Sequence, residues 1–372
     1  MTTKGSAEHI LETAFAFRSA KALLTAVELG LFSALAEGPL DAGALARRLR
    51  LNGRGASDFF DALVALNFLS RDVLGRYANT LDAAMYLDRR KPSYIGGLLT
   101  YLNARQYESW GLLTQALREG AAQCGPSAPG GFSEFYRDRA SFTTFMQGMA
   151  GGIVLPAQAL AAKFPWKMYR NFVDIGCAQG CMAVEVASGH PHLAGSGFDL
   201  PQVAAAFGTY VQQRGLAERL AFRPGDFLAE PLPSADVLIM ARILHDWDAA
   251  TRTMLLQKAY DAIHPGGALI VCETLIDDER RLKVHALLSS LNMLLQTAGG
   301  SESTGAEYSE ALRAAGFGQT HILPLTGLYS AVIGIKRPLL RGDFQELAQN
   351  GLMPLSLVAA ARTYGRNATD KL

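Results

Sequence analysis

The stretch "VDIGCAQG", residues 173–180, predicts the end of an apolar strand, a tight turn and the start of a helix. Gly176 and Gly180 flank the turn, where glycine lets the backbone approach a ligand closely and the next helix offers free N–H groups. Ala178 replaces the second glycine of a GxGxxG motif. The stretch alone therefore predicts a strand–turn–helix unit, and a nucleotide-binding turn and a purely structural turn stay equally open.

The sequence after residue 170 continues as short apolar strands that alternate with helices. Strands are predicted in "NFVDIG", "LAGSGFDL", "LAFRPGDF", "ADVLIMA" and "GALIVCETL", which begin at residues 171, 193, 220, 235 and 267. This alternation indicates a parallel sheet covered by helices on both faces. Residues 320–337 predict two further strands as an antiparallel addition at one edge. The expected fold is α/β: a Rossmann-like, doubly wound, mostly parallel sheet with an antiparallel edge strand.

The N-terminal part has a different, mostly helical pattern. Residues 8–36 carry apolar side chains at helical spacing and predict one helix. Residues 38–80 predict a short helix, a glycine-rich turn, a second helix and a hairpin, which is the order of a winged helix-turn-helix. A DNA-reading second helix should carry basic side chains, but residues 56–69 carry Asp58 and Asp61 and no cation. The apolar surface of the first helix instead favours a packing or dimerisation module.

Residues 90–168 predict interrupted helices, with a loop at 124–132. The apolar side chains of Phe145, Met146 and Met149 fit a core and an aromatic pocket equally well. The tail 338–372 predicts two short helices that cap the subunit or reach a partner.

The composition of the 372 residues, 49% apolar and 19% charged, is typical of a soluble chain of about two domains. A net charge of +1 gives no strong field for nucleic acid or an anionic membrane. The four cysteines form no CxxC pair or zinc-binding cluster, which favours reduced, buried thiols. The N-terminus lacks the pattern of a signal peptide. No apolar run in the sequence reaches the roughly 18–20 residues that a membrane-spanning helix needs. We therefore expect a cytoplasmic protein.

Two acidic residues stand at the ends of successive predicted strands. Asp199 ends the second strand, where a carboxylate can accept hydrogen bonds from ribose hydroxyls. Asp226 follows the third strand, where it could meet an adenine amine. Either alone reads as a solvated loop acid. Together with the glycine turn they favour an adenosine cofactor, because ligands of open α/β sheets bind at the carboxyl ends of the strands.

His245, in "MARILHDWD" (residues 240–248), follows the fourth strand, and Glu273 ends the fifth. These ends lie close together on the rim of a doubly wound sheet. A lone histidine is more often packing than chemistry. A neutral imidazole with a pKa near ~6.5 can take a hydroxyl proton, however, and a carboxylate behind the ring fixes its tautomer. The convergence favours a general base, and we interpret Trp247 as packing that holds the turn.

Over residues 10–336 the chain resembles class I S-adenosylmethionine (SAM)-dependent O-methyltransferases, of the plant caffeic-acid type and the bacterial antibiotic-pathway and acetylserotonin type. Its motifs are "VDIGCAQG", "GFDLP", "LHDWD", "IHPGGALIVCETL" and "GGSESTGAEYSEALRAAGF". The resemblance implies SAM as cofactor, no metal, a small aromatic acceptor and a homodimer. It divides the chain into a winged-helix dimerisation domain, a linker lining the acceptor pocket, a SAM-binding catalytic domain and an extension, at residues 1–105, 106–168, 169–337 and 338–372.

The resemblance also implies roles for individual residues. His245 would be the general base, held by Glu273 and Glu302. The cofactor would contact Asp174, Gly176, Gly180, Asp199, Leu200, Asp226, Phe227 and Arg242. The acceptor would contact Trp110, Met146, Met149, Asp246, Asn292 and Met293. Two departures stand out: Cys177, Ala178 and Gln179 occupy a loop that is richer in glycine in the family, and Ala241 replaces a basic residue whose role Arg242 would take.

The function predicted from these features is SAM-dependent O-methylation of a hydroxylated aromatic or polyketide-like small molecule. Three alternatives stay open: a SAM-binding hydroxylase, decarboxylase or pericyclase that transfers no methyl group, an N- or C-methyltransferase, and a ligand-sensing DNA-binding regulator. The presence of His245 with both acids argues against the first alternative, and the acidic second helix argues against the last.

Overall fold

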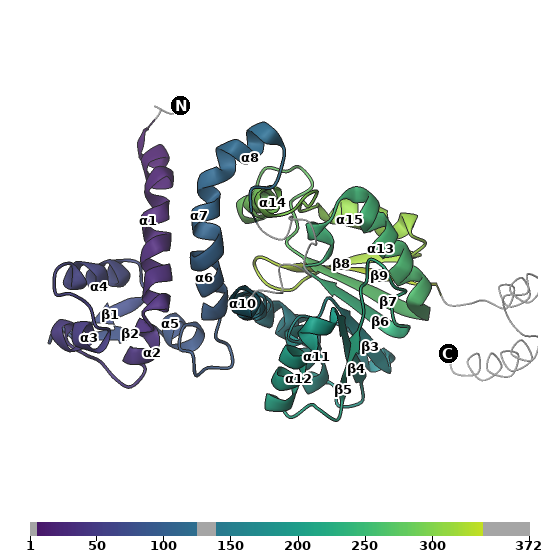
Figure 1. Ribbon diagram of the computed structural model, residues 1–372, viewed down its shortest axis with the longest axis horizontal. Helices are drawn as coiled ribbons and strands as arrows, with labels where there is room; N and C mark the ends of the chain where they lie inside the picture. The colour runs from purple at the N-terminus through teal and green to yellow at the C-terminus, as the bar shows by residue number, and fades with distance from the viewer. Residues whose placement is uncertain (1–5, 125–138, 338–372) are drawn as a thin grey trace, which may run out of the picture.

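The computed structural model describes residues 6–124 and 139–337, so the predicted tail and most of the 124–132 loop lie outside the described residues. Figure 1 shows a helical N-terminal part beside a sheet covered by helices, with the long helix α10 (Arg139–Lys163) between them. The helical winged-helix part and the α/β part that the sequence predicts are both present.

The N-terminal part begins with two helices rather than the single helix predicted over residues 8–36, which was wrong. Helix α1 (Glu8–Glu28) ends two residues before Gly30, whose left-handed φ of 71° separates it from α2. The winged-helix order that follows is confirmed. Its elements are α2 (Leu31–Leu35), α3 (Ala42–Arg48), α4 (Ala56–Ala65), β1 (Leu69–Arg71), β2 (Tyr77–Asn79) and α5 (Leu81–Tyr86).

The connecting part consists of interrupted helices, as predicted. Its elements are α6 (Gly96–Tyr101), the π-helical turn η1 (Leu102–Gln106), α7 (Tyr107–Ser109), η2 (Trp110–Leu112), α8 (Leu113–Glu119) and α10. Contrary to expectation, residues Phe142–Lys163 are long and apolar enough to cross a membrane. Half of that apolar window is buried, however, and Ala157 and Leu160 are fully enclosed beside the sheet. This helix is apolar because it packs inside the fold.

The sheet has seven strands in the order β5-β4-β3-β6-β7-β9-β8. Strands β3 to β7 are parallel, and β9 pairs antiparallel with both β7 and β8. The antiparallel addition is therefore confirmed, although the later strand, β9, lies inside β8. The strands are β3 (Asn171–Ile175), β4 (Ala194–Asp199), β5 (Leu220–Pro224), β6 (Ala235–Ala241), β7 (Ile263–Glu273), β8 (Gln319–Pro324) and β9 (Ser330–Ile335).

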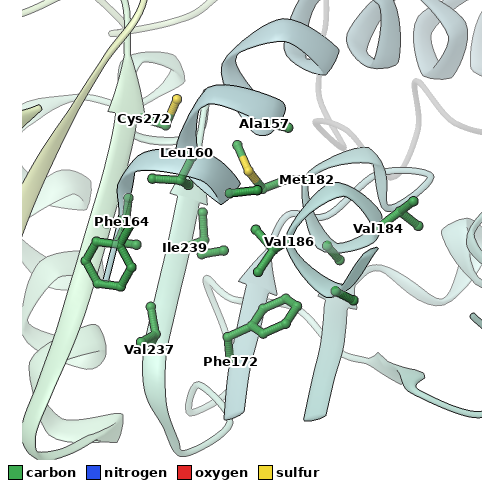
Figure 2. Close-up of a cluster of buried hydrophobic side chains, with 14 of the residues drawn as sticks. Ala157, Leu160, Phe164, Phe172, Met182, Val184, Val186, Val237, Ile239 and Cys272 are labelled. Atoms are coloured by element: carbon green, nitrogen blue, oxygen red, sulfur yellow. The ribbon is translucent and has the colours of Figure 1, made fainter. Parts of the chain in front are cut away.

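Alternate side chains of the strands build two cores. One face packs against α10, α11 and α12, and Figure 2 shows Phe172, Val237 and Ile239 of the strands beside Leu160 and Met182 of the helices. The other face packs against α13 and α15. The helices of this part are α11 (Cys181–Gly189), α12 (Ala204–Gln213), α13 (Ala249–Ala262), α14 (Val284–Gln296) and α15 (Gly305–Ala314).

The strand order reverses between β3 and β6, because β4 lies on one side of β3 and β6 on the other. Crossovers on opposite faces leave a crevice at the carboxyl ends of the strands at such a reversal, where open α/β sheets bind their ligands. The fold therefore directs attention to the ends of β3, β4 and β6.

Candidate active site

A cavity of about 390 Å³ opens at this reversal. Its walls come from the ends of β3, β4 and β6, from α10 and α14, and from the turn η1. The predicted residues that line it are Met149, Asp174, Gly176, Asp199, Leu200, Asp226, Phe227, Arg242, His245, Asp246, Asn292 and Met293. The structure thus gathers most of the predicted side chains, from distant parts of the chain, around one space.

The loop after β3 forms one end of the cavity. Gly176 has a φ of 66°, and a Cβ atom there would lie 2.3 Å from Cδ1 of Ile243, so the tight turn needs glycine. Asp199 fixes the loop, because its Oδ2 accepts a hydrogen bond from the Ala178 N–H at 2.8 Å and its Oδ1 accepts one from Leu200 at 2.7 Å. Burial raises the pKa of Asp199 to about 6 against the effect of these two donors.

Two buried polar atoms at the cavity lack hydrogen-bond partners among the described residues. Oδ2 of Asp174 is enclosed without a hydrogen bond, and burial raises the pKa of this carboxyl to about 8. Nε of Arg242 is likewise enclosed without a partner, although Nη1 donates to Tyr329 Oη at 3.1 Å. Buried polar atoms are nearly always hydrogen-bonded, so these two groups fit a ligand that carries both a donor and an acceptor.

The loop after β5 forms the next wall. Oδ1 of Asp226 accepts a hydrogen bond from the Leu228 N–H at 2.8 Å, and the Phe227 ring meets Trp247 edge-on, with centroids 5.9 Å apart. Lys258 of α13 holds this loop from behind, because its Nζ donates to the carbonyl oxygens of Phe227, Leu228 and Glu230 at 2.8, 2.9 and 2.8 Å. Trp247 both packs, as predicted, and lines the cavity.

His245 lies in the short helix η5 (Leu244–Asp246) directly after β6, with only 3% of its surface exposed. Its Nδ1 is 3.0 Å from Oε1 of Glu302 and 3.2 Å from Oε2 of Glu273. Nδ1 faces two carboxylates, so we assign the proton of the neutral ring to Nδ1. Nε2, which is 3.5 Å from Oδ1 of Asp246, is then the atom that can accept a proton on the cavity side.

Both glutamates are themselves held in place behind the imidazole ring and outside the cavity lining. Oε1 of Glu273 accepts hydrogen bonds from the Ile243 and Leu244 N–H groups, both at 3.1 Å. Oε1 of Glu302 also accepts a hydrogen bond from Ser289 Oγ at 2.7 Å. Neither acid lines the cavity, and the contacts of both acids orient the histidine.

The acids also set the protonation of the histidine. Burial opposes a charge on His245, but Glu273, Glu302 and Asp246 together outweigh burial and raise its pKa to about 9. Burial and the neighbouring Glu302 charge raise the pKa of Glu273 to about 7. The pKa of Glu302 is lowered despite burial, because His245 and Ser289 stabilise its charged form.

His245, Glu273 and Glu302 are also residue types that ligate metals, and their ligand atoms lie within 4.8 Å of one another. Nδ1, however, already donates a hydrogen bond to Glu302, and Oε1 of Glu273 accepts two backbone N–H groups. Hydrogen bonding accounts for this arrangement, which matches an oriented base as in a histidine–carboxylate pair.

The opposite end of the cavity is largely apolar, with Phe145, Met149 and Met293 in its wall. Polar side chains also line the cavity, and one of them is Asn292. Oδ1 of Asn292 accepts hydrogen bonds from Trp110 Nε1 at 3.2 Å and Gln296 Nε2 at 3.0 Å, which assigns the amide orientation. The NH₂ group of Asn292 is thereby the part of this side chain free to donate to a ligand.

Three predicted contact residues do not line the cavity. Met146 is buried away from it, Trp110 lies behind Asn292, and Gly180 is the N-cap of α11. Met146 and Met149 lie only about 60° apart around the axis of α10, yet of the two only Met149 reaches the cavity. Gly180 acts structurally: a Cβ atom there would lie 2.7 Å from the Phe207 ring.

Sequence reasoning missed several lining residues, notably Tyr101, Gln106, Ile153, Met182, Gln296 and Thr297. Gln296 follows Asn292 by four residues, so helical spacing could have found it. Tyr101 and Gln106 are five residues apart, and an α-helix would place them about 140° apart around its axis. The wider π turn η1 brings both to the cavity, and the sequence carries no signal for that turn.

The structure also shows the state of the four cysteines. Cys177, Cys181 and Cys272 are buried free thiols, as expected, and Cys124 is a half-buried free thiol.

Comparisons with known proteins bear on both parts of the chain. Residues 110–318 match the O-methyltransferase domain and residues 11–89 match the O-methyltransferase dimerisation domain. The tetracenomycin polyketide synthesis 8-O-methyltransferase of Streptomyces glaucescens is 40% identical over 88% of this chain and 96% of that protein. An N,N-dimethyltransferase, OxyT of Streptomyces rimosus, is 39% identical over 84% and 90%. The crystal structure of human N-acetylserotonin methyltransferase in complex with SAM superposes with a TM-score of 0.83 at 32% identity, covering 91% and 99% of the two chains. The chain belongs to the O-methyltransferase family, whose cofactor is SAM.

Proposed function

We propose that this enzyme methylates a hydroxyl group of an aromatic or polyketide-like small molecule, with His245 as the general base. The observation that carries the proposal is the placement of His245 at the cavity, with Nδ1 on Glu302 at 3.0 Å and Glu273 at 3.2 Å. A histidine oriented by carboxylates on one nitrogen leaves the other free to take a proton.

The residues at the β3 and β4 ends fit SAM. The unpartnered Oδ2 of Asp174 suits the ammonium group of an amino acid, and the Asp199 carboxylate suits ribose hydroxyls. The Asp226 and Phe227 loop suits the adenine ring. We assign Gly176 and Leu200 to the surface that contacts the cofactor. Arg242 would contact the carboxylate of the cofactor or the acceptor. When bound, SAM supplies a methyl group on a positively charged sulfur atom.

His245 performs the proton transfer in this proposal. A phenol with a pKa near ~10 is a weak nucleophile at neutral pH, so removal of its proton by Nε2 raises its reactivity. Glu302 and Glu273 stabilise the imidazolium that results. With a pKa of about 9, His245 is protonated at neutral pH in the ligand-free protein. A positive charge bound in the same cavity would lower the pKa of His245 and favour the neutral, basic form of the ring.

The acceptor class follows from the far end of the cavity. Phe145, Met149 and Met293 suit a flat apolar ring, and Asn292 and Asp246 offer hydrogen bonds at its edge. The predicted contacts Trp110 and Met146 act behind this wall, where Trp110 orients Asn292. The Streptomyces glaucescens relative, named for polyketide synthesis, supports a polyketide-like phenol as acceptor and a place in antibiotic biosynthesis.

The protein is proposed to act as a homodimer in the cytoplasm. Residues 11–89 match a dimerisation domain, and α1 exposes large apolar side chains that a second copy would cover. These side chains are Ile10, Leu11, Phe15 and Phe17. The division of the chain at residues 105, 168 and 337 stays a prediction.

The test is transfer of the labelled methyl group of SAM to a panel of phenols, hydroxynaphthoic acids and polyketide-like hydroxyanthraquinones. We expect a methyl ether product and one S-adenosylhomocysteine (SAH) per methyl group transferred. The panel includes the amine analogue of each phenol, because OxyT is an N,N-dimethyltransferase. Preferential methylation of the amines would contradict the proposed O-methylation and identify the enzyme as an N-methyltransferase. SAH-free conversion of an acceptor would contradict methyl transfer altogether.

A further inference from the structure

Arg252 connects the two segments that carry His245 and Glu302. It lies in the first turn of α13, where Asp248 caps the helix by accepting a hydrogen bond from the Thr251 N–H at 2.8 Å. Its Nε donates to the carbonyl oxygen of Trp247 at 2.7 Å, two residues after His245. One side of the guanidinium therefore holds the segment of the base.

The other side of the guanidinium holds the segment of the acid. Nη1 of Arg252 donates to Ser303 Oγ at 3.0 Å, and Nη2 donates to Ser301 O at 2.6 Å and to Ser301 Oγ at 2.9 Å. These two serines flank Glu302. A planar guanidinium fixes the directions of its donors, so the same side chain sets the spacing of both segments.

The distance between these two segments matters because His245 and Glu302 are far apart in the sequence. His245 and Glu302 are 57 residues apart in the chain, and their side chains meet at 3.0 Å. Arg252 itself does not line the cavity. A displacement of about 1 Å in a catalytic geometry can reduce turnover by up to about 100-fold.

We propose that Arg252 is a positioning residue that holds His245 and Glu302 at hydrogen-bond distance. The inference rests on the proposed role of His245 as the base. Arg252 would thus act in the reaction from outside the cavity. It keeps the proton of His245 on Nδ1 and leaves Nε2 of His245 available to the acceptor hydroxyl.

The pKa of His245 separates this role from a simple effect of charge. The charged groups that face the ring are Glu273 from β7, Glu302 from the loop before α15, Asp246 from η5 and Arg242 after β6. Loss of the Arg252 cation alone would favour protonation of His245 and raise its pKa. Loss of the close Glu302 contact would remove a group that stabilises the imidazolium and lower its pKa.

The experiment compares R252M and R252K with the native protein as the full chain. With ¹³C-labelled histidine, the His245 signal, identified among the seven histidines by its absence in H245A, is titrated by NMR. Turnover is measured with 3-hydroxy-1-naphthoate as the probe acceptor. We expect a lower pKa of His245 in both variants and a kcat up to about 100-fold lower, with a much smaller change in KM for SAM.

K336M is the matched control. Lys336 donates to the carbonyl oxygens of Tyr260 and Ile263 at 2.6 and 2.8 Å, at the far end of α13, so this variant also breaks a cationic clamp. It should leave both the His245 pKa and kcat unchanged. If R252M does not fold, R252K decides, because lysine keeps the charge and cannot bridge both segments.

An unchanged or higher His245 pKa in the Arg252 variants would overturn the inference. H245A distinguishes this outcome from failure of the proposed function. Native turnover in H245A refutes the base itself, whereas an inactive H245A beside Arg252 variants with native kcat and native pKa refutes only the positioning role.

Discussion

Nδ1 of His245 lies 3.0 Å from Oε1 of Glu302, a residue 57 positions later in the chain. The contact joins the segment after β6 to the loop before α15 and orients the imidazole toward the cavity. Glu273 adds a second carboxylate from the end of β7, at 3.2 Å. The proposed chemistry depends on this pair, and the predictions below test it from different sides.

Replacement of Glu302 by glutamine should impair the base more than the fold. E302Q keeps the shape of the side chain and removes the charge that stabilises the imidazolium. We expect kcat to fall about 10- to 100-fold, which is less than the roughly 100- to 10,000-fold that general-base catalysis contributes, because the base itself remains. The pKa of His245 should also fall. S290A is a suitable control, because Ser290 Oγ accepts a hydrogen bond from the backbone N–H of Glu302 at 3.2 Å rather than from its carboxyl group. A native rate in E302Q would remove Glu302 from the mechanism.

Binding of SAM should release a proton that binding of SAH does not. His245, with a pKa of about 9, is charged at pH 7.5 in the free protein, and the positive sulfur of SAM lowers that pKa. SAH lacks this charge but shares the amino group, so the difference isolates the effect. Calorimetry in buffers of different ionisation enthalpy counts the protons.

The same linkage makes SAM affinity rise relative to SAH affinity with increasing pH up to about 9, by at most about tenfold per pH unit. Glu273, Glu302, Asp246 and Arg242 also face the ring, so H245A is the control that assigns the proton. Equal proton release by the two ligands in the native protein would contradict a charged His245.

Replacement of Gly176 by alanine should weaken both the fold and cofactor binding. A φ of 66° costs a non-glycine residue about 1–2 kcal/mol, and the new Cβ would clash with Ile243, which lines the cavity. We expect a lower melting temperature and weaker SAH binding in G176A. G208A is the matched control: no atom lies near its new Cβ in α12, so it should stabilise the helix by about 0.5–1 kcal/mol. Native SAH affinity in G176A would argue against this loop as the cofactor site.

Replacement of Lys258 by methionine should weaken cofactor binding through the loop of Phe227. Three carbonyl oxygens lose their cationic donor, and hydrogen bonds to a charged group contribute about 1.5 kcal/mol or more each. We expect KM for SAM to rise about tenfold in K258M with little change in kcat. Steady-state kinetics beside K336M measures the effect. A fall in kcat without a change in KM would place the adenine ring elsewhere.

The sequence predicts the parts of the fold that local patterns determine. The five parallel strands appear where their apolar runs lie, and Asp199 and Asp226 stand at their ends, because both depend on neighbouring residues. Gly30 is a local signal for the break between α1 and α2, because glycine readily adopts the left-handed φ found there, and the single predicted helix overlooked it. The π turn before Tyr107 has no comparable local signal. No local signal shows that Gln106 faces the cavity.

The sequence allowed the residues of the site to be predicted, but it did not allow their contacts with one another to be predicted. Glu273 followed from the end of β7, whereas Glu302 required the family resemblance, because its approach to His245 is set by tertiary structure. The links through Arg252 and Lys258 lie on one helix, α13, and join loops that are distant in sequence. Only the folded chain reveals such bridges.

The measurement that tests the central claim most directly is the initial rate of methyl transfer by H245A, with the acceptor that the native protein methylates fastest. Labelled SAM gives the rate, and SAH binding to the same variant verifies the cofactor site. We predict a rate about 100- to 10,000-fold lower than that of the native protein, with SAH affinity retained. A native rate in H245A would contradict His245 as the general base.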